Sequence, residues 1–273
     1  MAPDRKLHEQ PVLQACGHDL FAGIKERMDK MIMENKRIEK YKEFFTGEFL
    51  MGPNSLRLLD EMLEKHPLKE GGRVMDLGCG TGLTSLFLAK EAGVSVFATD
   101  LWVPAAENAE RFKKWGIEDQ VIPIHADANT LPFAEGYFDA IVSIDAYHYF
   151  GAKEGVFTDK ILPFLKPGGV FIAAMPGVKE ELAGEAAALL LEWMEGNKDD
   201  LDTFHCRRWW LDLIGKSEEF EVVMDFDLDC YQEAWNDWFA SGHEYGLKDK
   251  AFMDRGIDRY LSFIGLVIQR REK

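Results

Sequence analysis

The chain has 273 residues, of which 47% are hydrophobic, and its 48 acidic residues against 32 basic ones give a formal net charge of −16. This composition is typical of a water-soluble globular protein. Because the average field repels phosphate backbones and anionic lipid surfaces, we expect neither nucleic acid nor membrane as a partner.

The N-terminal part of the chain has helical periodicity. Apolar residues recur at helical spacing over residues 19–40 and again over residues 55–66, SLRLLDEMLEKH, which end before Pro67. An aromatic stretch broken by glycine and proline, YKEFFTGEFLMGPN, lies between them. We therefore predict a helical N-terminal extension or lid over residues 1–70, with the main domain over residues 71–273.

The middle of the chain alternates short apolar runs with helical stretches. The runs are RVMDLG, VSVFATD, VIPIHAD, FDAIVSI and GGVFIAAM, and the predicted helices between them cover residues 83–91, 104–115 and 153–165. Such alternation predicts an α/β fold in which a parallel sheet has helices on both faces.

The C-terminal part begins with two helical segments, EELAGEAAALLLEWME and RRWWLDLIGKS. Two strand-like runs follow, FEVVMDFDLDC and YLSFIGLVIQRR, and a polar segment rich in tryptophan, AWNDWFASGHEYG, separates them. We predict that the two runs close the sheet as an antiparallel pair.

The most informative string is VMDLGCGTG, residues 74–82, which ends an apolar strand and opens onto the helix-like TSLFLAKEA. Its glycines let the backbone approach a ligand closely, and the helix beyond presents unpaired N–H groups. Asp100 ends the next strand, where a carboxylate can accept hydrogen bonds from ribose hydroxyls. The spacing matches neither the dinucleotide fingerprint G-x-G-x-x-G nor a phosphate loop, so we expect a nucleoside without a pyrophosphate. The alternative is a glycine-rich turn that binds nothing.

The string VMDLGCGTG resembles motif I of the class I S-adenosylmethionine (SAM)-dependent methyltransferases. Its companions follow in the family's order over about residues 72–175, as HADANTLPF, FDAIVSIDAYHYF and LKPGGVF. The resemblance implies a Rossmann-like doubly wound α/β sheet of seven strands, mostly parallel with the last strand antiparallel. It also implies SAM as the cofactor and S-adenosyl-L-homocysteine as the product.

The same resemblance implies the cofactor-binding residues. The glycine loop would face the methionine part, Asp76 would hold the ammonium group, and Asp100 would bind the ribose. Leu101 would lie against the adenosine, and Asp127 and Ala128 would face the adenine. For Asp145 we favour contact with the cofactor or a cationic acceptor, and the alternative is a capping residue with a solvated side chain. Tyr41 resembles an aromatic residue that closes over the methionine part. The predicted cofactor-binding set is Tyr41, Asp76, Gly78, Cys79, Gly80, Gly82, Asp100, Leu101, Asp127, Ala128 and Asp145.

Methyl transfer is an in-line displacement that needs alignment and exclusion of water, so a catalytic residue is not required. A hydroxyl or protonated amine as acceptor would need a general base, for which His148 and Tyr149 are the candidates. Pocket lining or packing is the alternative role for both. For the tryptophans at 209, 210, 235 and 238 we favour packing over an aromatic cage for a cationic amine.

We therefore predict a SAM-dependent methyltransferase that acts on a small molecule. A non-catalytic SAM sensor, or an enzyme that methylates protein or RNA, is the alternative. The N-terminus lacks the apolar run of a secretory signal and no segment has the roughly 18 apolar residues that a membrane helix needs. The four dispersed cysteines predict no metal site and a reducing, cytoplasmic location. We expect a monomer or homodimer, and the acceptor stays open.

Overall fold

The computed structural model describes residues 37–272. The chain falls into two compact units, Met1–Lys42 and Glu43–Lys273. The helix predicted over residues 19–40 lies almost entirely outside the described residues. Tyr41 belongs to the first unit, where its N–H donates to the C=O of Ile38 at 2.9 Å. The domain boundary predicted near residue 70 stays a prediction.

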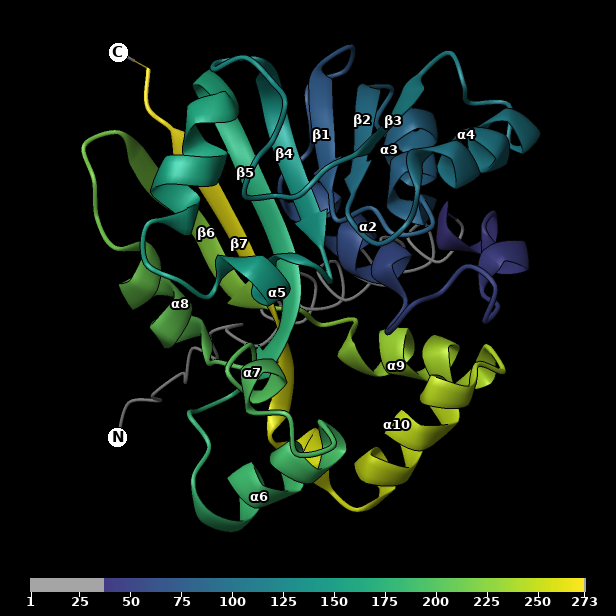
Figure 1. The fold of residues 1–273 in the computed structure, drawn as a ribbon, viewed down its shortest axis with the longest axis vertical. Coiled ribbons are helices and arrows are strands. Elements are labelled where there is room, and N and C mark those ends of the chain that lie inside the picture. The colour runs from purple at the N-terminus through teal and green to yellow at the C-terminus, as the bar shows by residue number, and fades with distance from the viewer. Residues whose placement is uncertain (1–36, 273) are drawn as a thin grey trace, which may run out of the picture. The chain divides into compact units, whose positions relative to one another are not determined.

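The second unit is built on a seven-stranded sheet with the order β3-β2-β1-β4-β5-β7-β6 (Figure 1). Strands β1 to β5 are parallel, and β7 runs antiparallel to both β5 and β6. The predicted fold class and its antiparallel last strand are therefore confirmed. The strands are β1 Arg73–Leu77, β2 Ser95–Asp100, β3 Val121–His125, β4 Phe138–Ile144, β5 Leu165–Val178, β6 Phe220–Asp227 and β7 Leu261–Arg270.

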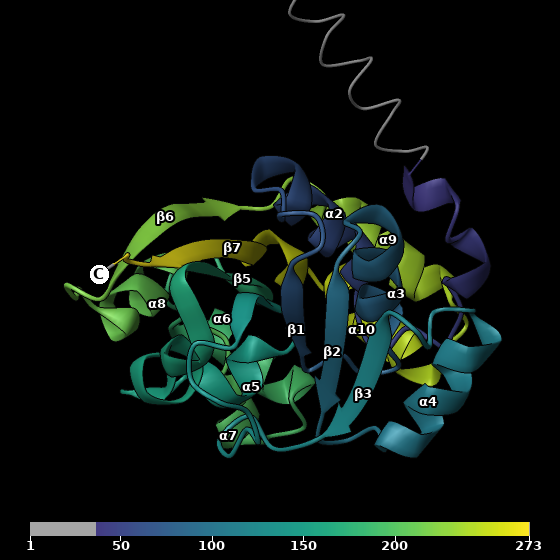
Figure 2. The same ribbon diagram turned by 90° about the horizontal axis from the view of Figure 1, so that it is seen from above.

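Helices cover both faces of this sheet. Figure 2 shows α2 on one face and α5 and α8 on the other. The helices are α2 Ser55–Lys65, α3 Leu83–Glu91, α4 Ala105–Lys114, α5 Tyr147–Gly151, α6 Gly184–Trp193, α7 Lys198–Leu201, α8 Arg207–Ile214, α9 Tyr231–Ala240 and α10 Glu244–Asp254, with short 3₁₀ turns at Lys42–Phe44, Leu162–Phe164 and Ile257–Arg259.

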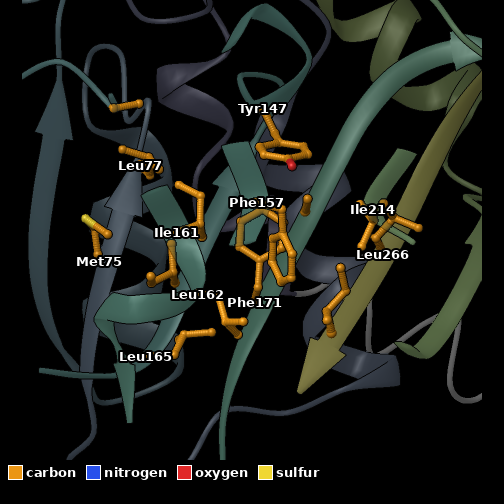
Figure 3. Packing of buried hydrophobic residues seen from close by; sticks show 14 of the residues in the cluster. Met75, Leu77, Tyr147, Phe157, Ile161, Leu162, Leu165, Phe171, Ile214 and Leu266 are labelled. Carbon is orange, nitrogen blue, oxygen red and sulfur yellow. The ribbon is translucent and has the colours of Figure 1, made fainter. Parts of the chain in front are cut away.

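The hydrophobic core beneath α5 and α8 contains every second residue of the strands, because successive side chains of a strand point to opposite faces of the sheet. On β7, Ile264, Leu266 and Ile268 alternate onto this face and are buried. Tyr147 of α5 packs edge-on against Phe171 of β5, with ring centroids 5.0 Å apart (Figure 3). This packing fixes the start of α5 directly after the end of β4.

One part of the predicted pattern was wrong. The helix expected over residues 153–165 is instead a π-helical turn, Phe157–Ile161, followed by a 3₁₀ turn. Pro163 stands inside the predicted helix, where it has no N–H to donate and clashes with the preceding turn.

The tryptophan-rich segment between the last two strands contains the helices α9 and α10. Ala234, Trp235 and Trp238 form the buried side of α9, at a spacing that fits one helical face. The carboxylate of Glu61 accepts the N–H groups of Asp229 at 3.0 Å and Cys230 at 2.9 Å and so anchors the start of α9. Packing of Trp210, Trp235 and Trp238, which the sequence favoured, is confirmed by their near-complete burial.

Candidate active site

The turn between β1 and α3 can be formed only with glycine at its key positions. Gly78 and Gly82 have φ angles of +79° and +87°, which residues with a β-carbon rarely adopt. A β-carbon on Gly78 would lie 2.3 Å from the Cβ of Ala146, and one on Gly82 would lie 2.4 Å from Phe112. The turn thus packs directly against the end of β4, which no larger residue would permit.

Hydrogen bonds from neighbouring elements hold this turn in place. The N–H groups of Gly78 and Cys79 donate to the C=O of Thr99 at 2.8 and 3.2 Å. The Asn108 side chain donates to the C=O of Gly80 at 2.9 Å. The hydroxyl of Thr81 donates to the C=O of Phe49 at 2.7 Å. The turn is therefore preorganised by β2, by α4 and by the segment that precedes α2.

Asp100 joins the ends of the first two strands. One carboxylate oxygen accepts the N–H of Gly80 at 2.8 Å, and the other accepts the N–H groups of Trp102 and Val103 at 2.7 and 2.8 Å. A carboxylate has about four acceptor sites, so one remains for a ligand. The side chain is buried at the carboxyl edge of the sheet, where ligands of open α/β folds bind.

A cavity of about 330 Å³ opens over this turn. Its volume lies within the range of small-molecule sites. Of the residues predicted from the sequence, it is lined by Gly78, Cys79, Gly80, Asp100, Leu101, Asp127, Ala128, Asp145 and Tyr149. Asp76, Gly82 and His148 are not among the lining residues, and Tyr41 belongs to the other unit.

The sequence reasoning missed several residues of the cavity wall. Phe49, Met51 and Gly52 come from the aromatic stretch before α2, and Trp102 follows Asp100. Glycine and proline within an aromatic run are the signal for a loop that covers a site. Asn108 was also missed, because a single polar residue within a helix gives no local signal of its partner.

Asp76 lies beneath the turn. One carboxylate oxygen accepts hydrogen bonds from Thr84 at 2.7 Å and Ser85 at 2.6 Å. The other is buried and has no partner among the described residues. Burial raises the pKa of Asp76 to about 6, against the lowering effect of the two hydroxyl donors. The free oxygen is an acceptor that a donor group would stabilise.

Asp145 stands at the end of β4 with a left-handed φ of +55°. Its N–H donates to the C=O of Ala174 at 2.7 Å, which fixes this conformation. A β-carbon on Gly52 would lie 2.7 Å from the Asp145 carboxylate, so a larger residue in the loop before α2 would displace this carboxylate. Burial, and then the negative charge of Asp249, raise the pKa of Asp145 to about 8.

The two candidate bases lie in different environments. His148 is 2% exposed, burial lowers its pKa to about 3, and its Nδ1 has no partner among the described residues. Tyr149 is 53% exposed and lines the cavity, with its ring centroid 5.1 Å from that of Trp102. The surrounding protein, and then Asp145, Asp200 and Asp249, raise the pKa of Tyr149. The base role of either residue stays a prediction.

Known proteins resemble this chain in the region that forms the site. Residues 74–169 match the family model described as a methyltransferase domain. The chain carries a class I SAM-dependent methyltransferase domain. The match begins within β1 and ends within β5, so it includes the glycine turn, Asp100 and the residues around Asp145.

Curated relatives match about half of the chain. Methyltransferase GfsG of Streptomyces halstedii is 30% identical over 135 residues, 49% of this chain and 48% of its own length. The 27-O-demethylrifamycin SV methyltransferase of Amycolatopsis mediterranei is 30% identical over 154 residues, 56% of this chain and 54% of its own length. The matched segment thus spans about half the length of these relatives.

A solved structure shares the fold over most of the chain. Geranyl diphosphate C-methyltransferase from Streptomyces coelicolor, solved with S-adenosyl-L-homocysteine, has a TM-score of 0.61 over 78% of this chain and 75% of its own, at 16% identity. At this identity the likeness shows the fold. Within the described residues, no helix is both long and apolar enough to span a membrane.

Proposed function

We propose that this protein transfers the methyl group of SAM to a small-molecule acceptor. The observation that carries the proposal is the hydrogen bond between the Asp100 carboxylate and the N–H of Gly80, which joins the two strand ends at the mouth of the cavity. The methyltransferase domain match over residues 74–169 supports it. The curated relatives, which include a 27-O-demethylrifamycin SV methyltransferase, support a small molecule as acceptor.

The residues present fit this cofactor. The glycine turn leaves backbone exposed to the cavity where any β-carbon would clash, and the fourth acceptor site of Asp100 suits a ribose hydroxyl. Asp76 does not line the cavity, so its hold on the ammonium group of the cofactor stays a prediction. Asp127 and Ala128 line the cavity where an adenine would need partners. When bound, SAM would supply an electrophilic methyl group on a positively charged sulfur.

The contribution of the chain is then positioning and exclusion of water. Phe49, Met51, Trp102 and Tyr149 all line the cavity. Apolar and aromatic walls of this kind hold an acceptor in line with the methyl group and keep water out, which is the main requirement for a displacement of this type. Cytoplasmic location and a monomeric or homodimeric state, expected from the sequence, belong to the same proposal.

Calorimetry with S-adenosyl-L-homocysteine tests the cofactor, and we expect a dissociation constant in the micromolar range. Release of S-adenosyl-L-homocysteine from SAM with members of a metabolite panel then tests turnover. Binding without turnover on any panel member would favour the non-catalytic sensor. Absence of binding by the intact chain would remove the proposal.

A further inference from the structure

The charged side chains that line the cavity include three aspartates, and two of them are occupied by hydrogen bonds within the protein. Asp100 accepts three backbone N–H groups. Asp127 accepts the backbone N–H and the side-chain amide of Asn129 at 2.8 and 2.9 Å. No donor to the carboxylate of Asp145 is found among the described residues. Asp145 is thus the aspartate of the cavity lining whose whole carboxylate is left for a ligand.

Aromatic rings lie beside this carboxylate. Trp102 and Tyr149 are 64% and 53% exposed, although both are large rings and their centroids lie only 5.1 Å apart. Tyr149 lies in α5, four residues after Asp145 in the chain, and both residues line the cavity. The faces of such rings carry partial negative charge and attract cations. A carboxylate and two accessible rings on one wall form a cation-binding surface.

Two aspartates on helices outside the matched domain add negative charge near Asp145 and Tyr149. Asp200 of α7 and Asp249 of α10 both lie close enough to Tyr149 to act on it electrostatically, and Asp249 also acts on Asp145. The two oxygens of Asp249 accept the indole N–H groups of Trp193 at 2.7 Å and Trp238 at 2.8 Å. Helices α7 and α10, which follow β5, therefore add negative charge close to Tyr149. Positions beyond the shared domain are where a methyltransferase is free to select its acceptor.

We propose that the acceptor is an amine, which binds as its ammonium form between the Asp145 carboxylate and the ring of Tyr149. The inference rests on the proposed function and names the substrate class of the same site. A carboxylate near a cation contributes Coulomb attraction and charge-assisted hydrogen bonds, and the rings add a cation–π contribution. The overall charge of −16 would draw a cationic molecule toward the protein.

An ammonium group has no lone pair, so it must lose a proton before it can attack. The proton passes from the ammonium nitrogen to the Asp145 carboxylate, and the freed lone pair forms a bond to the methyl carbon. The carbon–sulfur bond breaks and its electron pair stays on sulfur. The products are a neutral thioether, a protonated Asp145 and a methylated ammonium, so the total charge of +1 is the same before and after. The raised pKa of Asp145 suits this role, because a carboxylate of ordinary pKa is a weak base toward an ammonium.

The test compares choline with 3,3-dimethyl-1-butanol, which has nearly the same shape but no charge. Both probes are titrated by calorimetry into the full chain saturated with S-adenosyl-L-homocysteine, so that no turnover takes place. We expect choline to bind at least tenfold more tightly than the alcohol. In Asp145→Asn, titrated at a concentration of S-adenosyl-L-homocysteine that saturates the variant, the preference should fall below threefold. Asparagine tolerates the left-handed backbone at this position, so the variant keeps the local conformation.

Asp212→Asn is the matched control, because it removes one carboxylate from an exposed site on α8. It should keep the full preference for choline. A second readout is the number of protons released when choline binds at pH 7, obtained from titrations in two buffers of different ionisation enthalpy. Wild type and Asp212→Asn should release a fraction of a proton, and Asp145→Asn should release none.

Equal binding of the two probes, no binding of choline, or a preference that survives Asp145→Asn would overturn the inference. Each of these results can occur while S-adenosyl-L-homocysteine binds normally, and the proposed function then stands. Failure of S-adenosyl-L-homocysteine to bind in the first titration would remove the proposed function and this inference together.

Discussion

The amide N–H of Gly80 and the carboxylate of Asp100 are hydrogen-bonded at 2.8 Å, although 20 residues separate them in the chain. The bond joins the turn after β1 to the end of β2 and leaves the cavity open above it. This juxtaposition is what a nucleoside site of the expected kind requires.

The first prediction concerns Asp100. Asp100→Ala removes the acceptor of three backbone N–H groups, so we expect the free energy of unfolding to fall by about 2–4 kcal/mol. Affinity for S-adenosyl-L-homocysteine should fall at least tenfold, measured by calorimetry, and urea unfolding gives the stability. The exposed Asp119→Ala serves as control and should change neither quantity. Unchanged affinity in Asp100→Ala would contradict a ribose-binding role.

The second prediction uses a matched pair of glycines. Gly78→Ala brings a β-carbon within 2.3 Å of the Cβ of Ala146, whereas Gly116 has a similar φ of +63° with open space around it. We expect Gly116→Ala to cost about 1 kcal/mol from backbone strain alone. Gly78→Ala should cost more and abolish measurable binding of S-adenosyl-L-homocysteine. Equal effects of the two variants would mean that the contact with Ala146 does not matter.

The third prediction follows from the pKa of Asp145. In the unfolded chain the pKa is near 3.8, and burial raises it to about 8 in the folded protein, so the folded state holds the proton more tightly. The free energy of unfolding contributed by this group therefore falls as the pH rises from about 4 to about 8. Asp145→Asn lacks this titration.

Relative to wild type, Asp145→Asn should thus gain about 1–2 kcal/mol in free energy of unfolding between pH 5.5 and pH 8.5, in the absence of ligands. Urea titrations at several pH values measure this, with Asp212→Asn as a control whose difference from wild type should stay constant. A difference that does not depend on pH would show that Asp145 has an ordinary pKa.

The fourth prediction concerns the carboxylate that joins two tryptophans. Asp249→Ala leaves the buried indole N–H groups of Trp193 and Trp238 without their acceptor, which we expect to cost about 2–4 kcal/mol of stability. Loss of near-ultraviolet circular dichroism from the tryptophans should accompany it. The neighbouring Asp254→Ala, which removes only a surface ion pair with Lys250, should change stability by less than about 0.5 kcal/mol. Similar losses in both variants would contradict the role of the indole bonds.

The fifth prediction concerns His148, whose pKa is lowered to about 3 by burial. Such a group stays neutral between pH 5 and pH 9. We therefore expect His148→Gln to keep the shape of the pH profile of S-adenosyl-L-homocysteine release, whatever its effect on the maximal rate. If an acidic limb present in wild type disappears in the variant, His148 is the general base that the sequence suggested.

The local pattern of residue types was enough to predict most of the strands and helices. The apolar runs of the seven strands, the helix over 83–91 and the glycine turn at 78–82 each depend on residues close together in the chain, and the fold has them where they were expected. Residues 231–254 carried no secondary-structure prediction, because α9 and α10 each bury only a narrow side and so show a weak apolar period. Pro163 shortened the helix expected over 153–165.

The sequence by itself determined the order of strands and helices and the position of the glycine turn, because steric limits and apolar periodicity act over a few residues. Only the tertiary structure decided that Phe49 and Met51 line the cavity, that His148 is buried away from it, and that Asp145 lies in the field of Asp249. Burial and electrostatic environment are set by segments distant in the chain, and a carboxylate carries no local sign of which neighbours folding will place beside it.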